Sequence, residues 1–178
     1  MNFAPTPEQE QIKAAIERVC EPFDADYWLK KDRDGGFPHD FHQALAEAGW
    51  LGIAMPEEFG GGGSDDFRFN AVIDEELARY GGPAPSLSLQ NDVVAPYFNH
   101  LANDEQKARW MPGIASGELI LAVAMTEPGA GSDLAGIRTS AVRDGDDYIV
   151  NGEKVFITSG MRADWITVAV RTGEAGMK

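Results

Sequence analysis

The chain's most promising residues for chemistry lie together in one stretch, Ala124–Asp133. Its sequence is Ala-Met-Thr-Glu-Pro-Gly-Ala-Gly-Ser-Asp, which is typical of a strand end that runs into a glycine-rich loop. Glycines let backbone N–H groups approach a ligand closely and form concave sites for anions. Thr126 and Ser132 add hydroxyl donors. Such a loop suits the polar edge of a heterocycle together with a pyrophosphate.

Judged by its residue types alone, this stretch also has a plainer interpretation as an ordinary turn. A strand followed by a turn with two glycines is more often simply a turn. No Gly-Lys-Ser/Thr follows the loop, which excludes the phosphate loop of the nucleoside triphosphatases. The stretch also lacks the GxGxxG spacing that opens a helix in dinucleotide-binding domains.

Other reactive side chains form no convincing site. The chain has three histidines, His39, His42 and His100. His39 and His42 are three residues apart, but no carboxylate partner is placed beside them, so no metal site is predicted. Glu75 and Glu76 are interpreted as a solvated helix face, and Glu127 as a structural residue that holds the loop. Cys20 falls on the buried stripe of the first predicted helix and is expected to be inert.

Composition narrows the class of protein. The 178 residues carry a formal net charge of -14, and such a surface repels phosphate backbones, which argues against nucleic-acid binding. No apolar run reaches the length of a membrane span, and the N-terminus has no secretory or transit pattern. A single cysteine excludes an internal disulfide and agrees with a reducing cytosol, so a cytoplasmic location is expected.

Helical periodicity dominates the first two thirds of the chain. Thr6-Pro7-Glu8-Gln9 is a capping box with proline at the first helical position. The helix it opens has an apolar stripe formed by Ile12, Ala15, Ile16, Val19, Cys20 and Phe23. A turn is predicted over Lys31–Gly36, and Pro38 then opens a second helix that stops near Gly49–Gly52.

Three further helices are predicted before residue 117. Ser64 or Asp65 is expected to cap a helix that follows the glycine-rich loop 58–64 and ends at Gly81-Gly82-Pro83. A longer apolar helix should run from about Ser86 to Leu101. Asn103–Gln106 caps a short last helix that is expected to end at Trp110.

The period changes to that of strands after Gly117. Strands are predicted at Leu119–Thr126, Thr139–Arg143, Tyr148–Val150, Lys154–Thr158 and Trp165–Val170. Asp144–Asp147 and Asn151-Gly152 are interpreted as hairpin turns. The fold class is therefore α+β, with an all-helical N-terminal domain over 1–117 and an incomplete antiparallel β domain over 118–178.

The predicted β domain leaves an open hydrogen-bonding edge, because four or five strands lack a closing partner. We therefore expect the chain to be part of a larger fold. We also expect it to be marginally stable by itself and to associate through this edge.

Several motifs carry a resemblance to the acyl-CoA dehydrogenases. Met125–Asp133 is similar to the family's flavin loop, whose usual form is apolar-Thr-Glu-Pro-Gly-Ala-Gly-Ser-Asp. Asn151–Gly160 resembles the second flavin segment. The rest of the chain contains further similar stretches, at Met55–Gly61, Asp74–Arg79, Asn103–Lys107 and Pro112–Glu118. Ala124–Thr126 and Asn91–Tyr97 look nearest to the long-chain branch.

The resemblance implies an FAD site. The span 123–132 would line the flavin, with the hydroxyl of Thr126 on the isoalloxazine ring and Ser132 near the phosphates of CoA or flavin. Phe156 stands where many relatives carry tryptophan, and Thr158 would lie by the redox-active nitrogen. The cofactor-binding residues implied in this way are Val123, Ala124, Met125, Thr126, Gly131, Ser132, Phe156, Ile157 and Thr158.

For the substrate, the resemblance implies Ser132 together with the start of the long helix. Pro85, Ser86, Leu89 and Val93 align with residues that line the acyl channel in relatives. Core packing of an apolar helix is an equally good interpretation of these four residues.

The implied reaction is the α,β-dehydrogenation of an acyl-CoA thioester. A glutamate takes the α proton while the β hydrogen leaves as hydride to the flavin. In the family that base lies in a C-terminal helical domain, so it is expected beyond Lys178, and no catalytic residue is assigned in this chain. An electron-transfer flavoprotein is the implied acceptor, and the full-length family forms homo-oligomers. The alternatives are a non-catalytic remnant that binds flavin or CoA, and a related oxidase or nitroalkane-oxidising enzyme.

Overall fold

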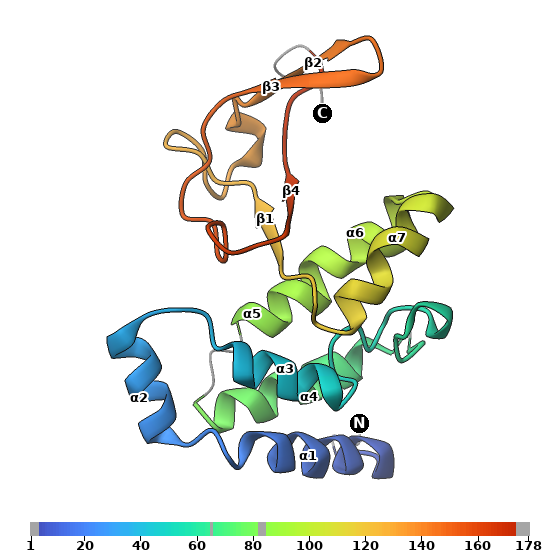
Figure 1. Cartoon of the computed structure of the whole chain (residues 1–178), viewed down its shortest axis with the longest axis vertical. Coiled ribbons are helices and arrows are strands. Elements are labelled where there is room, and N and C mark those ends of the chain that lie inside the picture. The colour runs from blue at the N-terminus through green and yellow to red at the C-terminus, as the bar shows by residue number, and fades with distance from the viewer. Residues whose placement is uncertain (1–3, 65, 82–84, 174–178) are drawn as a thin grey trace. The chain divides into compact units, whose positions relative to one another are not determined.

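The computed structural model describes residues 4–64, 66–81 and 85–173. The chain divides into two compact units, Met1–Ile120 and Leu121–Lys178. The α-helices of the described residues lie in the first unit, and the second holds the strands and the short 3-10 helix η3 (Leu134–Gly136) (Figure 1). The predicted fold class, a helical domain followed by a β region, is confirmed.

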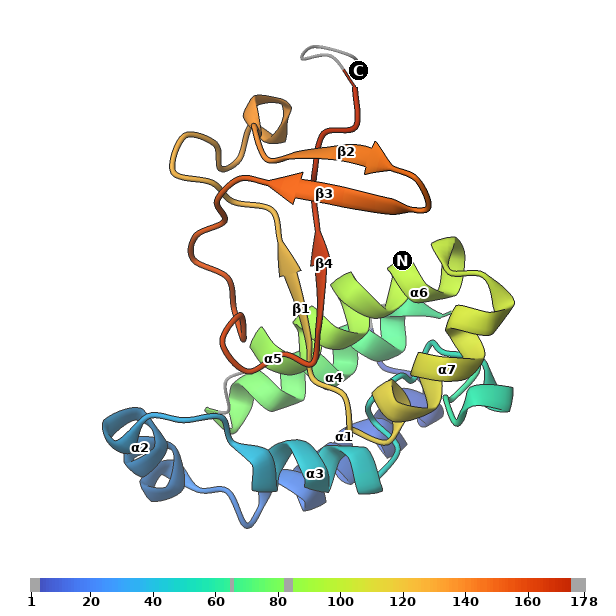
Figure 2. The ribbon, with the colours of Figure 1, turned by 45° about the horizontal axis from the view of Figure 1, so that its top comes forward.

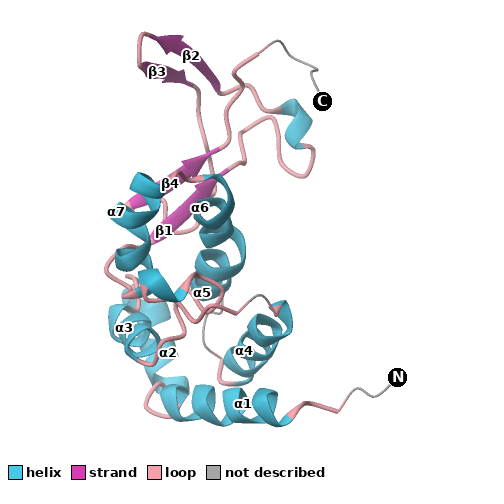
Figure 3. Ribbon diagram, turned by 90° about the vertical axis from the view of Figure 1, so that its right-hand side faces the viewer, coloured by secondary structure: helices cyan, strands magenta, loops and turns pink. Residues whose placement is uncertain are grey.

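The core of the helical unit lies between α1 (Pro7–Cys20) and α4 (Phe67–Arg79), which lie side by side in Figures 1 and 3. The predicted capping box of α1 is present, since the Thr6 side chain accepts from Gln9 N and the Gln9 side chain accepts from Thr6 N. Four apolar side chains of the two helices are almost completely buried: Ile16, Cys20, Ile73 and Leu77. The burial of these four side chains removes the apolar faces of both helices from water.

The cap of α4 differs from its prediction. Asp66 is the cap, and its side chain accepts from Arg68 N. Ser64 lies two residues earlier, where its hydroxyl accepts from Asp66 N. The other predicted cap, Asp65, lies outside the described residues.

Two helices fill the stretch between α1 and α4. The helix α2 (Ala25–Asp34) was missed, because the predicted turn over Lys31–Gly36 covers its last residues. Asp24 caps α2 by accepting from Tyr27 N, and Gly35 ends it with a φ of 70°. The helix α3 (His39–Glu47) starts after Pro38 as predicted, and a short 3-10 turn, η1 (Glu57–Phe59), follows farther along the chain.

The predicted helix from Ser86 to Leu101 is interrupted by a π-helical segment. α5 (Pro85–Ser88) runs into the π-helix η2 (Leu89–Val94), which runs into α6 (Ala95–Leu101). Pro96 at the start of α6 has no N–H, and in a regular α-helix its ring would clash with the carbonyl of Asp92. Widening the preceding turn relieves that conflict.

The last helix of the unit, α7 (Asp104–Ala115), is longer than predicted. Asn103 and Gln106 form the expected capping box, but the helix continues past Trp110 and through Pro112. Met111 and Ile114 are completely buried. Their burial offsets the backbone hydrogen bond that Pro112 cannot make.

The second unit contains two strand pairs. β2 (Ser140–Asp144) and β3 (Asp147–Asn151) form the predicted antiparallel hairpin around Gly145. β1 (Leu121–Ala124) pairs with β4 (Trp165–Val168) in parallel, with Leu121 opposite Trp165. Figure 2 shows both pairs. The expectation that the domain is antiparallel throughout is therefore wrong for β1 and β4, because the chain returns to the start of β1 before it enters β4.

The predicted strand Lys154–Thr158 is absent, and so is the predicted hairpin turn at Asn151-Gly152. Phe156 has a φ of 57° and Ser159 a φ of 60°, which are left-handed conformations that a strand does not contain. Gly152 passes so close to Thr139 that a Cβ atom at that position would lie 2.3 Å from Thr139 Oγ1. The glycine is required by this close crossing and makes no hairpin turn.

Among the helices in the described part of the chain, none has the length and apolarity to cross a membrane.

Candidate functional site

The predicted flavin loop begins where β1 ends. Val123 and Ala124 belong to the parallel ladder with β4, and Ala124 O also accepts from Ala169 N. These two residues thus anchor the start of the loop to the sheet. Met125 and Thr126, which follow, are half-buried.

The centre of the loop is a tight turn. Glu127 N donates to Ala130 O over 2.8 Å, and Ala130 N donates to Glu127 O over 3.1 Å. The plainer interpretation of the stretch as a turn therefore holds for residues 127–130. Gly131 and Ser132 come after the turn and are exposed, and their backbone N–H groups donate to no residue that the structure describes. These two amides and the Ser132 hydroxyl remain available to an anionic ligand.

The Glu127 side chain holds the loop in place, as predicted. Its carboxylate is buried and accepts from Arg138 N at 2.6 Å and from Thr139 N at 2.8 Å. Lys154 Nζ lies 2.9 Å from Glu127 Oε1. The loop is thereby connected both to the start of β2 and to the segment after β3.

The surroundings of Glu127 strongly favour its ionised form. The Thr139 hydroxyl, the Lys154 ammonium and the two backbone N–H groups lower the pKa of this carboxyl to about 2, against the opposing effect of desolvation. Held by these partners, the Glu127 carboxylate anchors the loop.

The second predicted flavin segment lies beside the first. Val155 N donates to Thr126 O over 3.0 Å, and Lys154 Nζ donates to Met125 O over 2.8 Å. Beyond these contacts, Phe156 is 94% exposed and Thr158 is exposed, while Ile157 is half-buried. Phe156 is held outward in a left-handed conformation that costs a residue with a side chain about 1–2 kcal/mol. Sequence reasoning placed Phe156 in the site but missed its backbone, because no local pattern requires a positive φ there.

The predicted acyl-channel residues belong to the helical unit. Leu89 is half-buried and Val93 is 39% exposed, both on the π-helix η2. Pro85 and Ser86 start α5, and their side chains lie outside the described part. Ser132 belongs to the β unit.

The π-helix is anchored by three consecutive polar residues that sequence reasoning did not single out. Gln90 Nε2 donates to Ile114 O at the end of α7. Asn91 accepts from Gly52 N at 3.0 Å and donates to Trp50 O at 2.8 Å. Asp92 accepts from Asn70 Nδ2 on α4. Three polar side chains in an otherwise apolar stretch were the available signal, since buried polar groups need partners.

Desolvation raises the pKa of Asp92 to about 6, and the nearby Asp74 carboxyl adds to the effect, while the hydrogen bond from Asn70 opposes it. Asp74 itself accepts from Ser88 Oγ at 2.6 Å. α4 is thus joined to the π-helix through Asn70 and Asp92, and to α5 through Asp74 and Ser88.

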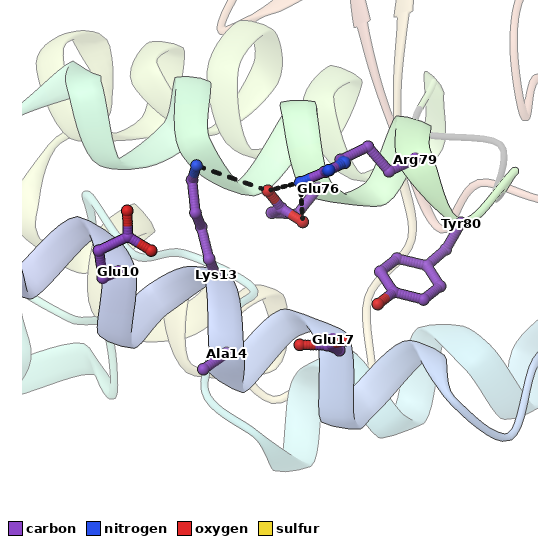
Figure 4. Close-up of a pocket in the computed structure, with 7 residues that line it drawn as sticks. All are labelled: Glu10, Lys13, Ala14, Glu17, Glu76, Arg79 and Tyr80. Carbon is purple, nitrogen blue, oxygen red and sulfur yellow. Dashed lines mark hydrogen bonds and ion pairs between the residues drawn. The ribbon is translucent and has the colours of Figure 1, made fainter. Parts of the chain in front are cut away.

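The prediction that Glu76 lies on a solvated helix face is wrong. Glu76 is 4% exposed, whereas Glu75 is exposed, so only Glu75 belongs to a solvated face. Arg79 Nη1 lies 3.1 Å from Glu76 Oε1, and Lys13 Nζ lies 3.9 Å from the same oxygen. These groups border a hollow of about 500 Å³ between α1 and α4 (Figure 4). Glu10, Glu17 and Tyr80 complete its polar lining, and its charge is largely compensated internally.

Two further reactive groups, Cys20 and His42, lie in the helical core, whereas His39 and His100 are exposed. Burial raises the pKa of the Cys20 thiol to about 11, with a further contribution from Glu76. Burial lowers the pKa of His42, which packs edge-on against Phe37. Within the described residues, no three His, Cys, Asp or Glu side chains come together as metal ligands.

The protein is an α+β chain of two units, and its β unit carries a glycine-rich loop that Glu127 and Lys154 hold in place. Two family models match the chain in the same order. "Acyl-CoA dehydrogenase, N-terminal domain" covers residues 6–118, and "Acyl-CoA dehydrogenase, middle domain" covers residues 122–178. The chain therefore belongs to the acyl-CoA dehydrogenase family.

Individual relatives agree with this assignment. The mitochondrial long-chain specific acyl-CoA dehydrogenase of Sus scrofa is 38% identical over 168 residues, which cover 94% of this chain and 38% of the relative. An acyl-CoA dehydrogenase structure from Geobacillus kaustophilus is 42% identical with a TM-score of 0.89, covering 97% of this chain and 45% of that one. A glutaryl-CoA dehydrogenase from Mycobacterium smegmatis, in complex with FADH2, is 28% identical with a TM-score of 0.86, covering 94% and 43%.

The chain thus spans less than half the length of these relatives.

Proposed function

We propose that this chain supplies the flavin-binding part of an FAD-dependent acyl-CoA dehydrogenase, which removes two hydrogens from an acyl-CoA thioester. The observation that carries the proposal is the juxtaposition of the two signature segments. Free amides at Gly131 and Ser132 and the exposed side chains of Phe156 and Thr158 belong to one small unit, in which Val155 N donates to Thr126 O. The likeness to a structure in complex with FADH2 supports FAD as the ligand.

The residues fit the chemistry of a flavin. Gly131 and Ser132 would bind its phosphates through backbone N–H groups, and Thr126 would offer a hydroxyl to the ring. Phe156 would give an apolar surface that excludes water, and Thr158 a second hydroxyl. When bound, FAD supplies the hydride-accepting chemistry. Leu89 and Val93 would contact the acyl chain of the substrate.

We assign no residue of this chain as the base that takes the α proton. Glu127 is excluded from that role, because its carboxylate is buried in structural hydrogen bonds and its pKa of about 2 makes it a poor proton acceptor. The electron acceptor is proposed to be an electron-transfer flavoprotein, and the complete enzyme a homo-oligomer in a cytoplasmic setting.

Flavin titration tests the proposal. The purified chain, incubated with FAD and passed over a desalting column, should retain the visible absorbance of oxidised flavin. Anaerobic addition of an acyl-CoA should then be compared with addition of free CoA as the matched control. Retained flavin that acyl-CoA bleaches supports a dehydrogenase. Retained flavin that is not bleached favours a flavin-binding element without catalysis, and failure to retain flavin contradicts the proposal for this chain.

A further inference from the structure

Lys154 joins the two segments of the proposed flavin site. Its Nζ lies 2.8 Å from Met125 O and 2.9 Å from Glu127 Oε1. The side chains of Lys154 and Glu127 are only 10% and 6% exposed. An ammonium that is almost removed from water is tolerable only where fixed partners replace its hydration. This lysine is therefore held in one geometry.

Glu127 extends the anchor to the rest of the unit. Its second oxygen, Oε2, accepts from Arg138 N, and Oε1 accepts from Thr139 N as well as from Lys154. One carboxylate thus collects donors from the entry to β2 and from the segment after β3. The end of β1 joins the same group, because Lys154 also donates to Met125 O.

The position of Lys154 determines the position of the residues that follow it. Val155 donates its backbone N–H to Thr126 O directly after Lys154, so consecutive residues are bonded to consecutive residues of the loop. Two adjacent bonds fix both the translation and the rotation of one segment against the other. Phe156 comes next, and its left-handed φ of 57° turns the chain outward.

We propose that Lys154 is a positioning residue, which sets the register of segment 155–158 against loop 125–127 and thereby shapes the flavin site without touching the flavin. The flavin part of this inference rests on the proposed function, whereas the register is a property of the free protein. A role in stability alone is the competing explanation, and buried ion pairs contribute little net stability on average.

Amide hydrogen exchange measures the register directly. Lys154→Met keeps the aliphatic volume of the side chain and removes its donors. We expect the Val155 amide to exchange about tenfold faster or more, relative to the ladder amides of β2 and β3 in the same sample. Arg162→Met, which removes one exposed positive charge from the same unit, is the matched control and should leave the Val155 amide protected.

The double variant Lys154→Met/Glu127→Gln separates positioning from simple charge burial. It leaves no unpaired charge behind, and Glu127→Gln alone, which keeps Lys154, is its control, because a glutamine side chain offers only one oxygen to the backbone N–H groups of Arg138 and Thr139. If Lys154 sets the register, Val155 stays unprotected in the double variant. Recovery of Val155 protection would overturn the proposal, because it would mean that only the orphaned carboxylate had disturbed the single variant. Unchanged Val155 exchange in Lys154→Met would overturn it equally.

The affinity for FAD is the second test of the proposed role of Lys154. We expect the Kd for FAD to rise about tenfold in Lys154→Met and in the double variant, with no change in Arg162→Met. Equal Kd values in the parent chain and both Lys154 variants would contradict a role in shaping the flavin site. If the parent chain binds no FAD, the proposed function fails, and the exchange of Val155 still decides whether Lys154 sets the register.

Discussion

At the scale of single residues, the glycine-rich loop depends on one carboxylate. Glu127 accepts two backbone N–H groups and the Lys154 ammonium, so that a loop with little secondary structure is fixed by charge-assisted hydrogen bonds. Such bonds are directional, which suits the proposed role of the loop in presenting the Ser132 amide and hydroxyl to a ligand. They also make the loop sensitive to acid.

Acid should destabilise the β unit through Glu127. Because the pKa of Glu127 is lowered from 4.5 to about 2 in the folded state, its contribution to stability is fully present above about pH 4.5. It is lost as the pH falls through about 2. Chemical denaturation followed by NMR signals of residues 121–173 at pH 6, 4 and 2.5 checks this expectation. In Glu127→Gln the loss between pH 6 and 2.5 should be smaller, and an identical pH dependence would contradict the assignment.

Thr126 provides a residue-scale test of the flavin contact. Thr126→Val keeps the shape of the side chain and removes the hydroxyl, so FAD affinity should fall about tenfold if that hydroxyl bonds the ring. Thr126 O, which accepts from Val155 N, is unaffected by the change. Titration with FAD is the measurement, and Thr167→Val on β4 is the matched control. Equal Kd values for all three proteins would remove Thr126 from the site.

At the scale of elements, the π-helix η2 is stabilised by its partners and not by its own backbone. Pro96 disfavours a regular helix there, and Gln90, Asn91 and Asp92 bond to α7, to the 50–52 turn and to α4. The wider turn of the π-helix lets these three successive polar side chains point in three different directions. Leu89 and Val93 stay on the same short segment, which is why its geometry matters to the proposed acyl channel.

At neutral pH, Asp92 should lower the free energy of unfolding of the helical unit. Its pKa is raised from 3.8 to about 6, so the folded state favours the protonated acid. The penalty for ionisation is absent below about pH 3.8 and complete above about pH 6. After allowance for solvent screening, Asp92→Asn should raise the free energy of unfolding by about 1 kcal/mol at pH 7.5.

Urea denaturation at pH 7.5 and pH 4 measures this effect. The gain from Asp92→Asn should largely disappear at pH 4. Asp32→Asn on the exposed side of α2 is the control, and it should change neither value appreciably. A destabilised Asp92→Asn protein at pH 7.5 would show that the hydrogen bond to Asn70 outweighs the desolvation of the acid.

At the scale of the whole molecule, the β unit exposes apolar side chains on its hairpin. Val142 is 63% exposed and Ile149 is 53% exposed, and they lie opposite each other on the same face. Exposed apolar strands with free edges are templates for pairing between chains. We therefore expect the predicted association to involve β2 and β3.

Self-association should depend on this face. We expect the chain to form dimers or larger species as its concentration rises, and Val142→Lys/Ile149→Lys to shift it toward the monomer. Sedimentation velocity over a range of concentrations is the measurement. Leu101→Lys, at a 76% exposed position of the helical unit, is the control that should keep the parent behaviour. A parent chain that stays monomeric at high concentration would contradict the prediction.

The sequence alone was sufficient wherever short-range chemistry decides the structure. The capping boxes at Thr6–Gln9 and Asn103–Gln106 join residues three positions apart, and the hairpin around Gly145 closes within a few residues. The apolar stripe from Ile12 to Phe23 and the structural role of Glu127 could also be predicted from the sequence. The flavin-loop motif was recognisable because its residue types are contiguous.

Only the tertiary structure decided the rest, because the deciding contacts join residues far apart in the chain. Lys154 meets Glu127 across 27 positions, and β1 pairs in parallel with β4 only after the hairpin has intervened. Phe156 adopts a backbone conformation that its own side chain disfavours, so no local preference could have predicted it. Local sequence sets the energies of neighbouring residues, whereas the strained, buried and paired positions are stabilised by partners that the fold alone brings together.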